Sequence, residues 1–244
     1  MHKYGFTQED LARVVVRARR HAMDNPHAHL KGNITVDDVM ASPMIAYPFK
    51  LFDICPRSSG SAAMVLGDMQ AVRRFATRPA FINGQASSTD TYWMGDRMCP
   101  TSETDVAEYT MIRDTTRKCY RQAAISDPVK QIQVAELYDP YSMNTPVMLE
   151  QTGFCGPGLA LRLEREGWWN ARGGAVAVNP SGGTLCTNPI GITGLVRAID
   201  AARQIMGKAG PMQLPNVRNA LATASGGTAQ FYNCTLFGDA PHGT

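Results

Sequence analysis

Three short glycine-rich turns in the last third of the chain are the segments best suited to contact a ligand. They read Asn179-Pro-Ser-Gly-Gly183, Asn188-Pro-Ile-Gly-Ile-Thr-Gly194 and Ser225-Gly-Gly-Thr-Ala229. Glycine tolerates positive φ and lets a ligand approach the main chain closely. None of the turns matches a P-loop or the G-x-G-x-x-G dinucleotide fingerprint. Taken singly, each indicates either a backbone-lined ligand site or a tight connection between packed elements.

Metal chemistry has little support in the sequence. The only close histidine pair is His27-x-His29, and no cysteine or carboxylate of ligand spacing accompanies it. The six cysteines are scattered without a C-x-x-C pair, at Cys55, Cys99, Cys119, Cys155, Cys186 and Cys234. We therefore expect no metal site, and we expect free, mostly buried thiols rather than disulfides.

Composition and charge exclude several classes of partner. The chain has 244 residues, 44% of them hydrophobic, and a formal net charge of +3, which is too small to indicate nucleic-acid binding. No apolar run approaches the ~18 residues that a membrane span needs, and Met1 to Phe6 contains no apolar signal core. The sequence predicts a cytoplasmic protein without a nucleic-acid or membrane partner.

The basic run from Arg17 to His21 has two interpretations. It is a solvated helix face, which is the common case for such a run, or it contacts an anionic group such as a CoA phosphate.

Periodicity predicts alternating helices and strands. Helices are expected after Thr7 and over 36–40, 68–76, 109–123, 145–153, 159–166 and 190–206. Strands are expected over 61–66, 80–85, 134–138, 175–178, 220–224 and 231–237, and the last two flank a Gly-Gly turn typical of an antiparallel pair. Residues 86–102 are predicted to form a polar loop. This alternation is typical of an α/β fold.

The order of the glycine-rich motifs resembles the C-terminal domain of thiolases, and most closely the sterol-carrier-protein-x type. In that family the second turn usually reads Gly-His-Pro-x-Gly-Ala-Thr-Gly. Upstream, Val134-Ala-Glu-Leu-Tyr-Asp-Pro-Tyr141 is similar in position to the family's His-Asp-Cys-Phe motif. The run from Phe52 to Ala63 resembles the Asp-Gly-Ala-Ala segment that ends the N-terminal domain.

The resemblance implies a thiolase-like layered αβα sandwich with a mixed five-stranded sheet, plus a loop domain. Residues 1–50 would form the loop region that covers bound CoA, residues 51–79 would end the N-terminal thiolase domain, and residues 80–244 would form the C-terminal domain. The family's nucleophilic cysteine lies upstream of the matched region. The resemblance therefore implies that this chain is incomplete alone and needs an N-terminal thiolase segment or subunit. It also implies a homo-oligomer, such as a homodimer, and a small OB-fold, zinc-ribbon partner.

Three family residues are replaced here. The histidine of Gly-His-Pro becomes Asn188, the second catalytic cysteine becomes Ala224, and the histidine of His-Asp-Cys-Phe becomes Tyr138. Asn188 can still donate a hydrogen bond to a thioester oxygen, but it cannot take a proton. Tyr138, with a reference pKa near ~10, acts as an acid or base only if its site shifts that pKa. The related steroid side-chain aldolases are similar in carrying a tyrosine at this kind of position, and they need no cysteine nucleophile.

The resemblance predicts carbon–carbon bond chemistry on acyl-CoA in lipid metabolism. Tyr138 and Asn188 are the predicted catalytic residues, and CoA is expected as a substrate thioester rather than as a bound cofactor. Its predicted contacts are the paired glycines Gly182, Gly183, Gly226 and Gly227. The first expectation is thiolytic acyl transfer of the acetyl-CoA C-acyltransferase type. The alternatives are retro-aldol cleavage of a β-hydroxyacyl-CoA and a non-catalytic structural subunit.

Overall fold

The structure, a computed structural model, describes residues 1–98, 108–227 and 229–242. Its strands are β1 (Met44–Ala46), β2 (Phe49–Lys50), β3 (Phe81–Thr89), β4 (Val134–Glu136), β5 (Ala177–Val178), β6 (Asn219–Gly226) and β7 (Phe231–Gly238). Its α-helices are α1 (Gln8–His21), α2 (Val36–Ala41), α3 (Met69–Phe75), α4 (Gly95–Met98), α5 (Thr110–Gln122), α6 (Pro128–Gln131), α7 (Asn144–Gln151), α8 (Ala160–Arg165), α9 (Gly183–Cys186) and α10 (Thr193–Met206).

One mixed sheet organises the molecule, with strand order β3-β7-β6-β4-β5. Strand β7 runs antiparallel to both of its neighbours, whereas β4 runs parallel to β5 and β6. The predicted antiparallel pair at the C-terminal end is confirmed, with Ala222 opposite Thr235. The predicted α/β class with a mixed five-stranded sheet is therefore confirmed.

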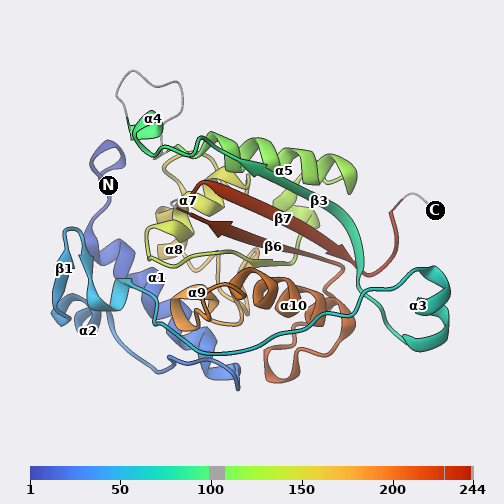
Figure 1. Cartoon of the computed structure of the whole chain (residues 1–244). Helices are drawn as coiled ribbons and strands as arrows, with labels where there is room; N and C mark the ends of the chain where they lie inside the picture. Colours follow the sequence, from blue (N-terminus) through green and yellow to red (C-terminus); the bar gives the residue numbers. More distant parts are fainter. Residues whose placement is uncertain (99–107, 228, 243–244) are drawn as a thin grey trace.

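Helices cover both faces of this sheet. Helix α5 packs on β3 and β7 and contacts α7, while α10 packs on β6 and β4 from the other side (Figure 1). Side chains of the central strands alternate between the two layers, as the period of a strand requires. On β6, Leu221 belongs to the core under α5, whereas Ala220 and Ala222 belong to the core under α10.

Helix α1 joins the N-terminal region to this body. Thr7 caps it, in a capping box with Asp10, and its apolar face packs against α8 and α9. The solvated-face interpretation of the basic run is wrong for Arg17, which is 3% exposed. Its Nε donates to Glu164 at 2.8 Å and its Nη1 donates to the Val178 carbonyl at 2.7 Å, so the charge is paired inside the protein.

Some predicted elements differ from the structure. Residues 61–66 are no strand here, because they have no neighbouring strand to pair with, and Val65 is 96% exposed. Strand β3 continues to Thr89, beyond its predicted end at residue 85, because β7 pairs with it as far as Thr89 opposite Phe231. Helix α10 begins at Thr193, three residues later than predicted, and the short helix α9 was not predicted.

The described residues contain neither a disulfide nor a membrane-spanning helix. Every cysteine in that part is free, and Cys119, Cys186 and Cys234 are buried; Cys99 lies outside the described residues. The same residues contain no group of three or more side chains arranged to hold a metal ion. Within the described part, no helix is long and apolar enough to cross a bilayer.

Candidate active site

Tyr138 and Asn188, the two predicted catalytic residues, line the same cavity of about 520 Å³. Its walls come from five parts of the chain that lie far apart in the sequence. These are residues 54–57, the start of α5, residues 138–148, residues 188–190, and Ser225, Gly227 and Ala229. The described polar residues of the lining are Cys55, Arg57, Tyr109, Tyr138, Tyr141, Asn144, Asn188 and Ser225. None of these is a histidine or a carboxylate, so the cavity favours chemistry by hydroxyl, amide and thiol groups.

Tyr138 is placed by the end of strand β4. Beyond the last ladder pair, the Leu137 N–H donates to Asn179 Oδ1 at 2.6 Å and the Tyr138 N–H donates to Thr223 Oγ1 at 2.8 Å. These two side chains continue the strand pairing and fix the direction in which Tyr138 leaves the sheet. Burial raises the pKa of the Tyr138 phenol, and Cys55 and Tyr141 add to the rise. Tyr138 is therefore a phenol at neutral pH, suited to donate a proton.

Asn188 is 6% exposed, and its amide is held from both ends. Its Oδ1 accepts from the Thr193 hydroxyl at 2.7 Å, and its Nδ2 donates to Cys55 Sγ at 3.1 Å. The backbone N–H of Asn188 donates to Ser58 Oγ at 3.1 Å. An amide nitrogen carries two hydrogens, so the contact with Cys55 leaves one for an oxygen in the cavity.

Cys55 is a site residue that the motif comparison missed. A bridge between Ile54 and Tyr141 seats its segment beside the Tyr138 segment, and the Cys55 N–H donates to the Pro140 carbonyl at 2.9 Å. Burial raises the pKa of the Cys55 thiol, although the hydrogen bond from Asn188 opposes the rise. The thiol is therefore neutral at neutral pH. The sequence feature that could have indicated Cys55 as a site residue is the Cys55-Pro56 pair, which lies in the segment resembling the end of the N-terminal domain.

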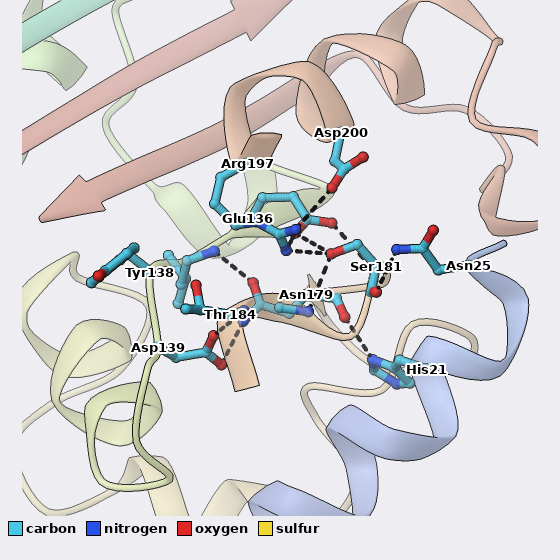
Figure 2. Close-up of polar contacts among 12 residues, drawn as sticks. His21, Asn25, Glu136, Tyr138, Asp139, Asn179, Ser181, Thr184, Arg197 and Asp200 are labelled. Atoms are coloured by element: carbon cyan, nitrogen blue, oxygen red, sulfur yellow. Dashed lines mark hydrogen bonds and ion pairs between the residues drawn. The ribbon is translucent and has the colours of Figure 1, made fainter. Parts of the chain in front are cut away.

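The Asn-Pro-Ser-Gly-Gly turn is hydrogen-bonded to the residues that follow β4 (Figure 2). Asp139 is 1% exposed, and its carboxylate accepts from Asn179 Nδ2 at 2.6 Å, Thr145 Oγ1 at 3.0 Å and the Thr184 N–H at 2.8 Å. Burial raises the pKa of Asp139 to about 6, against these hydrogen bonds. The motif thus fixes the backbone next to Tyr138.

A buried ion-pair network continues from this turn to α10 (Figure 2). Arg197 Nη1 lies 2.8 Å from Glu136 Oε2, and its Nη2 lies 3.0 Å from Asp200 Oδ2. Ser181 Oγ also donates to Glu136 Oε2, at 2.6 Å. Burial raises the pKa of Glu136 to about 7, opposed by the Arg197 charge. The network connects α10 and the turn to β4, the strand that leads into Tyr138.

His21, at the end of α1, is hydrogen-bonded to the Asn-Pro-Ser-Gly-Gly turn. Its Nε2 accepts from the Ala171 N–H at 3.0 Å, so its Nδ1 carries the proton and donates to the Asn179 carbonyl at 3.2 Å. Burial, and then the nearby Arg17 charge, lower the pKa of His21 to about 3. This histidine is therefore neutral and structural, and it does not line the active-site cavity.

The four predicted CoA-binding glycines lie in different surroundings. Gly182 and Gly183 have positive φ, and a Cβ on either would collide with its neighbours, Ala22 beside Gly182 and Asn179 and Asp139 beside Gly183. Gly227 lines the cavity, and Gly226 ends β6 beside it. The contact of all four with CoA stays a prediction, and for Gly182 and Gly183 the structure supplies a packing reason instead.

A thiolase-like class of fold is defined by this three-layer arrangement with its cavity at the strand ends, and sequence comparison agrees. A family model described as "Thiolase C-terminal domain-like" matches residues 96–239. The chain belongs to this family.

Relatives and a solved structure show which proteins this chain is similar to. It is 30% identical over 229 residues to "Acetyl-CoA acetyltransferase" from Methanothermobacter thermautotrophicus, covering 93% of this chain and 57% of the relative. It is 31% identical over 231 residues to "17-hydroxy-3-oxo-4-pregnene-20-carboxyl-CoA lyase" from Mycobacterium tuberculosis, with the same two coverages of 93% and 57%. The solved structure named "Ltp2-ChsH2(DUF35) aldolase" matches with a TM-score of 0.78 at 28% identity, over 98% of this chain and 60% of that one.

The predicted resemblance to thiolases is confirmed by these comparisons. The chain spans about 57% of the length of the two relatives. One relative is named as an acetyltransferase and the other as a lyase, so sequence similarity is compatible with either reaction.

Proposed function

We propose that this chain supplies the proton donor and the oxyanion donor of an enzyme that cleaves a β-hydroxyacyl-CoA by a retro-aldol step. The observation that carries the proposal is that Tyr138 and Asn188 line one cavity. The described lining of that cavity contains no histidine and no carboxylate. The 31% identical lyase and the aldolase structure support the same choice. On this support we propose the retro-aldol reaction ahead of the thiolytic reaction that the motifs first suggested.

The proposed reaction cleaves the Cα–Cβ bond of the β-hydroxyacyl-CoA. A base from the segment outside this chain takes the β-hydroxyl proton, the Cα–Cβ bond breaks, and a carbonyl product leaves. The electron pair of that bond becomes a thioester enolate, whose oxygen accepts the free Asn188 N–H. The Tyr138 phenol then gives its proton to Cα, which releases a shortened acyl-CoA, and solvent returns a proton to the phenolate.

Thiolytic acyl transfer is the second candidate, favoured by the 30% identity to an acetyl-CoA acetyltransferase. In that reaction Asn188 would still bind the thioester oxygen, while a cysteine from the N-terminal thiolase segment would carry the acyl group. Tyr138 would then take no part in proton transfer. In both candidates CoA is a substrate thioester, and the Arg57 guanidinium is the only charge in the described lining that could face its phosphates.

The partners are part of the proposal. An N-terminal thiolase segment or subunit completes the site, and the enzyme is a homo-oligomer. The solved aldolase is named for two components, which supports a second protein of the predicted OB-fold, zinc-ribbon type.

The two reactions separate on Tyr138→Phe, assayed in the assembled enzyme with a 3-hydroxyacyl-CoA and, separately, with a 3-oxoacyl-CoA plus CoA. Loss of a general acid costs about 10²–10⁴ in kcat, so retro-aldol cleavage should fall by that factor. Thiolysis should fall only mildly. Tyr47→Phe is the matched control, because Tyr47 is 79% exposed and does not line the cavity.

Cys55→Ala tests whether the reaction needs the thiol that lines the cavity. The substitution is preferred to chemical alkylation of Cys55, because an alkyl group would fill the cavity whereas alanine removes only the thiol. Retro-aldol activity should survive in Cys55→Ala. Unchanged activity in Tyr138→Phe and in Asn188→Ala would contradict both enzymatic candidates and leave the structural-subunit alternative.

A further inference from the structure

A second cavity, of about 390 Å³, is lined by α5 and by residues at and beyond the end of α7. We call it the α5–α7 cavity. Helix α5 and the segment that closes α7, residues 150–157, form most of its walls. It shares no described lining residue with the active-site cavity. Neither candidate reaction uses it.

Most polar groups of the α5–α7 cavity already have partners. Thr116 Oγ1 and the Tyr232 hydroxyl lie 3.0 Å apart, and the Tyr120 hydroxyl donates to the Thr152 carbonyl at 2.9 Å. The Glu150 carboxylate accepts from the Gly158 N–H at 2.9 Å.

Two lining atoms are buried without any hydrogen-bond partner, Arg113 Nε and Gln151 Oε1. The described side chains contain five such orphaned atoms, so two of the five fall in this one cavity. A buried polar atom without a partner is costly, because it loses its hydrogen bonds to water and gains none. The pair therefore indicates a bound group that supplies one acceptor and one donor.

Charge specifies the acceptor. Arg113 and Arg117 both line the cavity, and the Asp114 carboxylate between them lies 3.8 and 3.9 Å away, beyond hydrogen-bonding distance. The Arg113 side chain as a whole is 42% exposed, although its Nε is buried. A guanidinium pairs best with a carboxylate oxygen. Gln151 Oε1 accepts only, so it requires a hydroxyl or N–H from the ligand.

The remaining wall is apolar. Pro128 and Pro157 line it, together with Cys155. Burial raises the pKa of the Cys155 thiol to about 12, so this thiol stays neutral. Such a wall suits a hydrocarbon body and excludes a strongly hydrated ion.

We propose that the α5–α7 cavity binds a hydroxylated carboxylic acid, with its carboxylate on Arg113 and Arg117, its hydroxyl on Gln151 and its hydrocarbon body on the proline wall. This site is separate from the one that holds Tyr138 and does not depend on the reaction catalysed there.

Calorimetry on the assembled protein with three probes tests each contact. 3-Hydroxyoctanoate should bind more tightly than octanoate by roughly two- to tenfold, the worth of one neutral hydrogen bond. Octanoate should bind more tightly than octanamide by about tenfold or more, the worth of a bond to a charged group. Added salt should lower the affinity for the two carboxylates and leave the affinity for octanamide unchanged.

Two variants assign these differences to residues. Arg113→Met should reduce the preference for octanoate over octanamide, since Arg117 remains, and Gln151→Leu should abolish the preference for 3-hydroxyoctanoate over octanoate. Arg121→Met is the matched control, because Arg121 is exposed on the same helix and lines neither cavity. Binding that is absent at millimolar ligand, or that both variants leave unchanged, would overturn the site. Binding needs no turnover, so its outcome is independent of the proposed reaction.

Discussion

At the scale of single residues, Asn188 decides what chemistry the site can perform. An imidazole could serve as base and donor together, whereas an amide only donates and accepts. A donor stabilises an enolate only if its N–H points at the oxygen. The Thr193 hydroxyl, 2.7 Å from Asn188 Oδ1, turns the amide so that its nitrogen faces Cys55 and the cavity. Thr193 is thus a positioning residue that the motif comparison did not identify.

Asn188→Ala should lower kcat by about 10²–10³, the cost of removing one oxyanion donor. Thr193→Val keeps the amide but removes the bond that orients it, so it should cost about tenfold in kcat with little change in KM. Thr193→Ser restores the hydroxyl and should restore the rate. Steady-state kinetics and thermal melts on the assembled enzyme give the result. A Thr193→Val rate equal to wild type beside an impaired Asn188→Ala would show that the amide needs no orientation.

At the scale of elements, the Asn-Pro-Ser-Gly-Gly turn links the segment that carries Tyr138 to helix α10. Its Asn179 side chain accepts from the Leu137 N–H and donates to Asp139, and its Ser181 hydroxyl accepts from Arg197 of α10. The turn needs two consecutive residues with positive φ, which are Gly182 at 90° and Gly183 at 67°. Glycine is required here for space as well as for conformation.

Gly183→Ala separates these two requirements when it is compared with Gly173→Ala. Both positions have positive φ, but a Cβ at Gly183 would collide with Asn179 Nδ2, whereas one at Gly173 would meet nothing within 4 Å. We expect Gly173→Ala to cost about 1 kcal/mol of unfolding free energy. Gly183→Ala should cost roughly 1–3 kcal/mol more, because it overpacks a buried site. Urea unfolding measures both, and equal losses would show that crowding contributes nothing.

At the scale of the whole molecule, the N-terminal region reaches across the body to build the site. Residues 53–58 leave α1 and α2 and come to lie beside Pro140 and Asn188. The chain then runs exposed along 59–68 to helix α3, which projects from the body (Figure 1). Val65 is 96% exposed, Leu66 70% and Phe75 77%. We predict from the resemblance to thiolases that residues 61–66 join a sheet of the N-terminal domain when that domain is present.

We expect this chain, prepared alone, to be poorly soluble or to self-associate, because exposed apolar segments pair with other chains. The double variant Val65→Ser, Leu66→Ser should reduce the association. Tyr47→Ser, at a residue 79% exposed elsewhere, should not reduce it. Light scattering over a concentration series measures the mass. A monodisperse monomer of the unaltered chain would contradict the expectation.

Sequence by itself determined the α/β class, most of the helices and the family, because these depend on periodicity, caps and motif order, which are local. The capping box at Thr7 and the antiparallel pairing of 220–224 with 231–237 belong to that set. Only the tertiary structure decided which residues share a cavity, since Cys55, Tyr138 and Asn188 meet through long-range contacts that no local pattern encodes. For the same reason it decided that Gly182, Gly183 and Arg17 are buried in packing and ion pairs. It also decided that residues 61–66 form no strand, because a strand exists only when another segment supplies its hydrogen bonds.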